Sequence, residues 1–169
     1  MARSAHGAAL AALSAADPVM AALIARVGPC RLVVERRASP YQALVRAVAH
    51  QQLHAAAANA MLSRLGALAA GGSGIPEPAA LCALDDARLR GCGFSAAKAA
   101  ALRDIAARTL DGSVPSRRAL ARQDDAAVIE RLTQIRGVGR WTVEMLLIFT
   151  LGRPDVLPVA DYGVRNGFR

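Results

Sequence analysis

Gln134-Ile-Arg-Gly-Val-Gly-Arg-Trp-Thr142 is the stretch of this sequence that decides its fold. It is a glycine turn between two segments with a helical hydrophobic pattern. Gly137 and Gly139 permit positive φ and carry no side chain, so an anion can approach the backbone closely. The N–H groups of residues 137–140 stand at the start of the second helix, where unpaired donors and the helix dipole attract a phosphate. The stretch therefore predicts a helical hairpin that holds a phosphate.

Polar side chains around the turn favour the same interpretation. Arg136 and Arg140 supply positive charge on either side of the turn, and Thr142 offers a hydroxyl donor. Such contacts position a nucleic acid without reading its sequence. An ordinary turn between two helices is the alternative, because a lone G-x-G motif is weak. That alternative loses weight because hydrophobic positions flank the turn at the right spacing.

Composition and charge are consistent with a nucleic-acid partner. The 169 residues suffice for one compact unit, or for two small lobes that share a core. Hydrophobic residues make up 54% but aromatic residues only 4%, so Ala, Leu and Val must fill the interior. The formal net charge of +8 favours a polyanionic partner. A GC-rich genome would explain the preference for Arg over Lys, but not the net charge.

Cysteine usage and apolar segments limit the class of protein. The three cysteines match neither a zinc pattern nor a disulfide framework, so we expect the reducing cytoplasm. With a nucleic-acid partner, we expect association with the nucleoid there. Residues 7–16 superficially resemble a short secretory segment, but Asp17-Pro18 is better interpreted as a helix N-cap and first-turn proline. The longest apolar stretch, around residues 145–149, is too short to cross a bilayer, and we expect no membrane association.

The hydrophobic periodicity predicts an all-α fold. Ser39-Pro-Tyr-Gln42 is a capping box that opens a long helix, and the short extended segment 31–34 makes no sheet. The expected helices run from Pro18 to about Val27, from Ser39 through Leu44, Val45, Val48 and Leu53 towards Leu65-Gly66, from Ala79 to Arg90, from Ser95 to Thr109, briefly from Ser116, from Ala126 to Gln134, from Trp141 to Leu151, and onward from Asp161.

Four ordered blocks resemble the helix-hairpin-helix DNA glycosylase superfamily, and in particular its 3-methyladenine DNA glycosylase II branch. The blocks are Ser39-Pro-Tyr-Gln-Ala-Leu-Val-Arg-Ala-Val-Ala-His-Gln-Gln-Leu53, Gly93-Phe-Ser-Ala-Ala-Lys98, Leu132-x-x-Ile-x-Gly-Val-Gly-Arg-Trp-Thr142, and Leu151-Gly-Arg-Pro-Asp-Val-Leu-Pro158 with Asp161-Tyr-Gly-Val-Arg165. They cover about residues 38–169. The resemblance implies an all-helical, two-lobed fold with the lesion pocket between the lobes. It also implies a structural Na⁺ or K⁺ on the backbone carbonyls of Thr133, Ile135 and Gly137.

On this basis we expect three segments. Residues 1–37 form an N-terminal helical segment that belongs to a small second lobe. Residues 38–152 form the helical lobe, with the helix-hairpin-helix at about 125–151. Residues 153–169 carry the catalytic-aspartate loop and the start of a helix. Because the family has further helices after this point, which complete the second lobe and part of the pocket, the end at Arg169 suggests a fragment without them.

Asp161 follows Trp141 by about twenty residues and opens the last expected helix. From the residues alone an N-cap is its commonest role, whereas the resemblance makes it the catalytic carboxylate, and both roles can coexist. Cleavage of an N-glycosidic bond builds positive charge on the sugar, which a carboxylate stabilises while it orients a water.

Two other mechanisms lack the residues that they need. A lyase requires an amine, but Trp141 stands where lyase relatives carry lysine, and Lys98, the only lysine, lies in another block. No four cysteines follow Asp161, so we expect no iron–sulfur cluster. The sequence therefore predicts a monofunctional glycosylase with no required cofactor.

Candidate pocket residues come from the few aromatic side chains. Trp141, the only tryptophan, matches a pocket aromatic of the family, with core packing as the alternative. Met145 stands where some relatives carry an aromatic residue. Tyr41 and Tyr162 are candidate pocket walls, again with ordinary packing as the alternative. Alkylated purines are cationic and would stack on such electron-rich rings.

Gln51 and Gln52 lie where the family inserts a side chain into the gap left by a flipped nucleotide, and Gln52 is the expected wedge. His50 and His54 have metal-binding spacing but no third ligand, so we expect them to face solvent or DNA. The candidate DNA contacts are Gln51, Gln52, Arg136, Gly137, Val138, Gly139, Arg140 and Thr142.

The sequence thus predicts a monomeric base-excision repair enzyme that acts on double-stranded DNA containing damaged bases. It would flip alkylated purines such as 3-methyladenine and 7-methylguanine and hydrolyse their glycosidic bonds. Two alternatives stay open. One is a non-catalytic helix-hairpin-helix module that only binds DNA, and the other is a glycosylase for a neutral, deaminated base, for which no general acid is evident.

Overall fold

The computed structural model describes residues 6–69, 71–72 and 74–167, and these residues form helices and connecting loops without a strand. The helices are α1 (Gly7–Ala16), α2 (Pro18–Val27), α3 (Pro40–His50), α4 (Ala55–Ala67), α5 (Pro78–Cys82), α6 (Asp86–Gly91), α7 (Ala96–Leu110), α8 (Arg117–Leu120), α9 (Asp125–Leu132), α10 (Arg140–Leu146), the π-helical η1 (Leu147–Leu151) and α11 (Tyr162–Gly167). The predicted all-α class is confirmed. No helix in the described part of the chain is both long and apolar enough to span a bilayer.

The chain divides into two compact units, Met1–Val33 and Val34–Arg169. In the first unit α1 and α2 pack against each other. Asp17 caps α2 as predicted, because its Oδ1 accepts hydrogen bonds from the amides of Val19 (2.7 Å) and Met20 (3.1 Å). Neither helix contains a buried residue, so this pair of helices has no core of its own.

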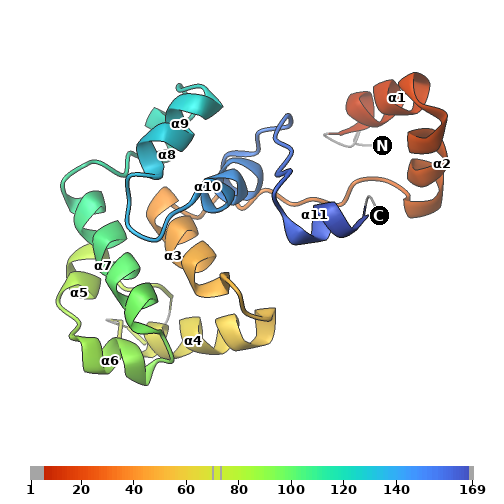
Figure 1. The fold of residues 1–169 in the computed structure, drawn as a ribbon. Helices are drawn as coiled ribbons and strands as arrows, with labels where there is room; N and C mark the ends of the chain where they lie inside the picture. Colours follow the sequence, from red (N-terminus) through yellow and green to blue (C-terminus); the bar gives the residue numbers. More distant parts are fainter. Residues whose placement is uncertain (1–5, 70, 73, 168–169) are drawn as a thin grey trace. The chain divides into compact units, whose positions relative to one another are not determined.

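Helix α3 is the centre of the second unit and packs against α4, α7 and α10 (Figure 1). Its predicted capping box is present, since Ser39 Oγ accepts from the Gln42 amide and Gln42 Oε1 accepts from the Ser39 amide. The core is almost entirely aliphatic. Its fully buried side chains include Leu44, Val45 and Val48 of α3, Leu102 and Ile105 of α7, Val128 and Leu132 of α9, and Val143 and Leu147 of α10 and η1.

The predicted long helix from Ser39 to Leu65-Gly66 is wrong, because the chain breaks it between His50 and Ala55. At the break Gln52 adopts a left-handed conformation with φ +56°, and Leu53 is exposed rather than turned inward. The ammonium group of Lys98 donates hydrogen bonds to the carbonyls of Ala49 and Gln51, both at 2.9 Å. In a continuous helix these carbonyls would accept hydrogen bonds from the amides of residues 53 and 55. By occupying them, Lys98 favours the end of α3 at this point.

The predicted helix from Ala79 to Arg90 is also divided, into α5 and α6. Asp85 begins a new helix there, because its Oδ1 accepts a hydrogen bond of 2.7 Å from the Arg88 amide. The side chain therefore caps α6 from a position that the hydrophobic pattern alone would place inside one helix.

The last long predicted helix, from Trp141 to Leu151, changes its pitch. α10 widens into η1, and Gly152, at φ +73°, ends it. The amide of Glu35 donates 2.7 Å to the Phe149 carbonyl, and Arg117 Nη2 donates to the Thr150 carbonyl. A neighbouring loop and α8 thus satisfy carbonyls that the wider turn leaves without an α-helical partner.

Candidate active site

The turn between α9 and α10 has two glycines in different conformations. Gly137 has φ +74°, and a Cβ atom there would lie 2.7 Å from Ala101 Cβ of α7. Gly139 is the extended N-cap of α10, and a Cβ atom there would meet open space. Gly137 therefore lets the turn lie directly on α7, whereas Gly139 leaves its outer face accessible.

The outer face of the turn carries free hydrogen-bond donors. Within the described residues, no hydrogen bond occupies the amides of Gly137, Gly139 and Arg140. The Val138 amide was predicted to be free, but it donates a 3.0 Å hydrogen bond to the Ile135 carbonyl inside the turn. The Val138 side chain is buried and anchors the turn in the core. The remaining amides at the start of α10 can still bind an anion.

Two polar side chains hold the hairpin from neighbouring helices. Asp104 of α7 accepts a 2.7 Å hydrogen bond from the Arg136 amide. Gln51 Nε2, at the end of α3, donates to the Gly137 carbonyl at 2.9 Å and to Thr142 Oγ1 at 3.1 Å. The backbone geometry of the turn is therefore fixed before any ligand binds.

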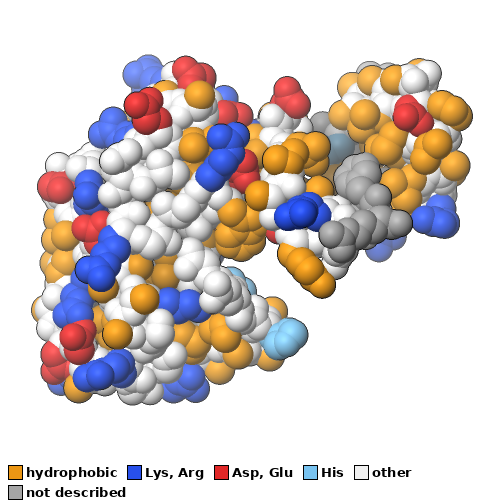
Figure 2. Space-filling view, viewed as in Figure 1, with side chains coloured by type: hydrophobic (Ala, Val, Ile, Leu, Met, Phe, Trp, Pro, Cys, Tyr) orange, Lys and Arg blue, Asp and Glu red, His pale blue; other side chains and the backbone are white. Residues whose placement is uncertain are grey.

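A buried carboxylate orients one of the two predicted arginines. Arg140 Nε donates 2.9 Å to Glu144 Oε1, one turn later on α10. The Glu144 side chain is only 5% exposed, whereas the Arg140 side chain is 70% exposed. The guanidinium is thus held at its inner edge and presents its other N–H groups to solvent beside the turn. Across the visible face of the larger unit, Lys and Arg side chains are interspersed with Asp and Glu (Figure 2).

Asp161 lies at the N-terminus of α11 and receives two hydrogen bonds. The Val164 amide donates 2.9 Å to Oδ1, and Trp141 Nε1 donates 2.7 Å to Oδ2. These two hydrogen bonds hold the pKa of Asp161 below its usual value, with the larger contribution from the Val164 amide and the next from Trp141. The carboxylate is therefore ionised at neutral pH, and it is an N-cap at the same time, as predicted.

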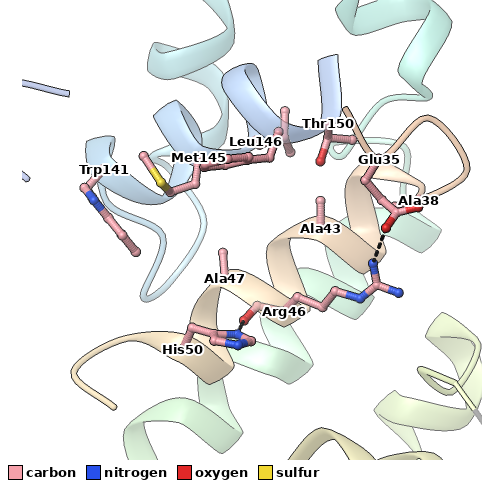
Figure 3. Close-up of a pocket in the computed structure, with 11 residues that line it drawn as sticks. Glu35, Ala38, Ala43, Arg46, Ala47, His50, Trp141, Met145, Leu146 and Thr150 are labelled. Carbon is pink, nitrogen blue, oxygen red and sulfur yellow. Dashed lines mark hydrogen bonds and ion pairs between the residues drawn. The ribbon is translucent and has the colours of Figure 1, made fainter. Parts of the chain in front are cut away.

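A pocket of about 350 Å³ lies between α3 and the α10–η1 segment (Figure 3). It is lined by Glu35, Ala38, Ala43, Arg46, Ala47, His50, Trp141, Met145, Leu146, Phe149 and Thr150. Trp141 and Met145 project from α10 towards Ala47 and His50 of α3, so two predicted pocket residues share one wall. The Trp141 ring lines this pocket while its N–H group holds Asp161, which links the apolar cavity to the carboxylate.

Comparison with known proteins identifies the family. Residues 45–169 match the HhH-GPD superfamily of base excision DNA repair proteins. The chain belongs to this superfamily. The resemblance predicted from the four sequence blocks is thereby confirmed.

Two relatives and one solved structure show how similar the chain is to other HhH-GPD proteins. It is 48% identical over 130 residues to DNA-3-methyladenine glycosylase 1 of Schizosaccharomyces pombe, a match that covers 77% of this chain and 57% of the relative. It is 33% identical over 154 residues to the alkylbase DNA glycosidase-like protein mag2 of the same organism, covering 91% and 72%. The structure of S. pombe 3-methyladenine DNA glycosylase (Mag1) in complex with abasic DNA superposes with a TM-score of 0.89 at 44% identity, covering 95% and 78%. The chain thus spans little more than half the length of the first relative.

Three site residues of this HhH-GPD chain lie elsewhere than predicted. Tyr41 does not line the Trp141 pocket; its side chain is buried and its hydroxyl donates 2.7 Å to the Pro76 carbonyl. Burial raises the pKa of Tyr41. Tyr162 is 80% exposed on α11 and is not among the residues that line the pocket. Thr142 is 1% exposed with its hydroxyl held by Gln51, so it cannot serve as an outward phosphate donor.

The two glutamines have separate positions. Gln51 was predicted to contact DNA, but its side chain is directed at the hairpin instead. Gln52 is exposed at the tip of the break between α3 and α4. His50 is half-buried at the pocket, where its Nδ1 lies 2.9 Å from the Arg46 carbonyl, and His54 is exposed. No cluster of three or more metal-ligating side chains occurs among the described residues.

The carbonyls predicted to hold a monovalent cation are compatible with that role. The Ile135 carbonyl accepts from Val138, and the Gly137 carbonyl accepts from Gln51. Each carbonyl oxygen has a second lone pair, so one hydrogen bond leaves room for a cation. The Thr133 hydroxyl is directed back at the carbonyls of Ile129 and Glu130 and does not compete for the cation.

Two polar residues of the site, Glu144 and Asp104, were absent from the sequence prediction, and the contacts of Lys98 were not foreseen. Glu144 had a detectable signal, since it follows Arg140 by four residues on a helix. Asp104 and the bonding partners of Lys98 had none, because each acts on a segment more than thirty residues away in the chain.

Proposed function

We propose that this chain is a DNA N-glycosylase that removes alkylated purines, of the 3-methyladenine and 7-methylguanine type, from double-stranded DNA. The observation that carries the proposal is the bond between the ionised Asp161 carboxylate and Trp141 Nε1, since the same indole ring lines the pocket. The names of the similar proteins, which include DNA-3-methyladenine glycosylase 1 of S. pombe, support the same reaction. A monomer acting in the cytoplasm on the nucleoid completes the proposal.

Binding would begin at the hairpin. The free amides of Gly137, Gly139 and Arg140 bind a backbone phosphate at the start of α10, and the Arg140 side chain adds charge. A Na⁺ or K⁺ on the carbonyls of Thr133, Ile135 and Gly137 would add positive charge there. These contacts read no sequence, which suits a protein that must search undamaged DNA.

The damaged nucleotide is then flipped out of the duplex. Gln52, exposed at its break in the helix, fills the gap as the wedge, and the base enters the pocket beside Trp141. A cationic alkylated purine gains from stacking on the indole face. Met145 and the alanines of α3 supply apolar walls that pack against the rest of the flipped base.

Asp161 acts on the bond between sugar and base. As that bond breaks, its electron pair leaves with the base, and positive charge develops on the sugar. The Asp161 carboxylate stabilises this charge and orients a water, which adds to the sugar carbon and releases a proton to solvent, leaving an abasic site. Lys98 does not provide the amine of a lyase, since its Nζ is held by the Ala49 and Gln51 carbonyls. The strand is therefore expected to stay uncut.

Single-turnover release of methylpurines from methylated duplex DNA tests the proposal. The native chain should release base and leave alkali-labile, uncut strands. Asp161→Asn should slow release by about 100-fold or more, with duplex affinity unchanged, because only transition-state stabilisation is lost. Duplex binding without release would favour a DNA-binding module. Release of hypoxanthine in preference to methylpurines would favour the neutral-base alternative.

A further inference from the structure

Lys98 stabilises the end of a helix to which it does not belong. It lies on α7, and its Nζ donates to the carbonyls of Ala49 and Gln51 at the end of α3. Unpaired carbonyls and the negative end of the helix dipole make a helix C-terminus favourable for a cation. Desolvation lowers the pKa of Lys98, which agrees with a partly buried ammonium group held against the α3 terminus.

The carbonyls that Lys98 holds flank an unusual backbone conformation. Gln52 follows Gln51 directly and has φ +56°, in the left-handed region that residues other than glycine adopt only when their surroundings hold them there. The Leu53 amide closes the same turn with a 3.2 Å hydrogen bond to the His50 carbonyl. The lysine thus fixes the peptide immediately before Gln52, and with it the direction in which Gln52 leaves the turn.

Gln51 connects this turn to the hairpin. Its backbone carbonyl accepts from Lys98, and its side chain donates to the Gly137 carbonyl and to Thr142 Oγ1. One residue is therefore bonded to α7 through its backbone and to the hairpin through its side chain. A displacement of Gln51 would change the spacing between Gln52 and the hairpin amides.

We propose that Lys98 is a positioning residue for base flipping, which sets Gln52 at a fixed distance from the hairpin so that the wedge enters the duplex where the hairpin grips it. The inference rests on the proposed function, and in particular on Gln52 as the wedge. A lysine suits the task because its compact ammonium has three donors, which can meet two converging carbonyls. Lys98 contacts neither base nor phosphate in this role and acts through Gln52.

Insertion of the wedge can be measured without base release. The probe is a duplex with 2-aminopurine beside a tetrahydrofuran abasic analogue, whose fluorescence rises when an inserted side chain unstacks the reporter. We expect Lys98→Met to lower the rise at saturation by about fivefold or more. The dissociation constant of Lys98→Met for undamaged duplex should stay within about twofold of that of the control variant, Arg103→Met. An unchanged fluorescence rise would overturn the proposal.

Arg103→Met is the matched control. Arg103 lies on the same helix as Lys98, and its substitution by Met removes the same charge. It forms an ion pair with Asp86 at the surface instead of a bond with the end of α3. Lys98→Arg, which keeps the cation, should recover a substantial part of the fluorescence rise. Should Lys98→Met not fold, Lys98→Gln, which retains amide donors, is compared with the same control.

A double-mutant cycle separates positioning from general destabilisation. In a Gln52→Ala background, Lys98→Met should change the fluorescence rise by less than about twofold, because the side chain that it positions is gone. An effect as large as in the native background would show that Lys98 does not act through Gln52 and would overturn the proposal. Failure of the proposed function is distinguishable, since it would abolish methylpurine release by the native chain while wedge insertion remained measurable.

Discussion

The hairpin and the Asp161 segment belong to the same site but are held in different ways. The hairpin lies on the core, with Ile135 and Val138 buried and with bonds from α3 and α7. The Asp161 segment is exposed, with Leu157 63% and Val159 68% accessible. Within the described residues, its carboxylate receives one tertiary hydrogen bond, from Trp141. The proposed DNA grip is thus preorganised by packing and several hydrogen bonds, whereas the proposed catalytic carboxylate receives its one tertiary hydrogen bond within the described residues from an indole.

The largest effect should come from disturbing the packed region. Gly137→Ala places a Cβ atom 2.7 Å from Ala101 Cβ at a φ of +74°. We expect the free energy of unfolding to fall by about 2–4 kcal/mol from strain and overpacking, with a parallel loss of duplex affinity. Chemical denaturation and DNA titration measure the two quantities.

Gly139→Ala is the matched control for Gly137→Ala. It adds the same methyl group where the backbone is extended and nothing lies within 4 Å. Stability should change by less than about 0.5 kcal/mol. Equal losses in the two variants would contradict the view that contact with α7 fixes the hairpin.

A smaller effect, but one confined to chemistry, should follow from loosening the exposed region. Trp141→Phe keeps an aromatic ring in the pocket and removes the N–H group that holds Asp161. We expect single-turnover base release to slow by about tenfold, with duplex affinity unchanged, because the carboxylate loses its fixed position. If affinity and release fell together, Trp141 would be holding the fold rather than Asp161.

The pKa of Asp161 reports the same change independently. The Val164 and Trp141 hydrogen bonds depress it, so removing one donor should raise it towards the usual value. Because protonated Asp161 cannot stabilise positive charge, the loss of activity at acid pH should begin at a higher pH in Trp141→Phe. A carboxyl-carbon NMR titration of the native chain and the variant measures the shift, and an unchanged pKa would contradict the proposed bond.

The smallest effect concerns a residue that the sequence had placed on the DNA. Thr142→Val removes the hydroxyl that accepts from Gln51 and keeps the side-chain volume. We expect a loss of stability of about 0.5–1.5 kcal/mol from the broken hydrogen bond. The salt dependence of duplex affinity should stay the same. A lower salt slope would show that the Thr142 hydroxyl contacts a phosphate after all.

The elements that sequence predicted best are those whose signals are local. Ser39 and Asp17 cap their helices as their neighbours in sequence indicate, and the glycine turn lies where its residues require. The break after α3 was missed because it depends on Lys98, which is 47 residues from Gln51 and carries no mark of that contact. The periodicity of the segment alone favours one continuous helix.

The site follows the same division. The pocket position of Trp141 and Met145 could be expected from the motif, because both follow the turn on one helix. Tyr41 was misplaced because a tyrosine at a helix start gives no indication of its hydroxyl partner, here the Pro76 carbonyl 35 residues away. The burial of Thr142 depends likewise on Gln51, a residue of another helix.

Trp141 is also a built-in optical reporter, because the chain has a single tryptophan and therefore no background emission from another indole. Its ring lines the pocket and its N–H group bonds Asp161, so stacking of a ligand and protonation of the carboxylate should each change its emission. Occupancy of the pocket and the ionisation of Asp161 can thus be followed in real time on the unlabelled protein.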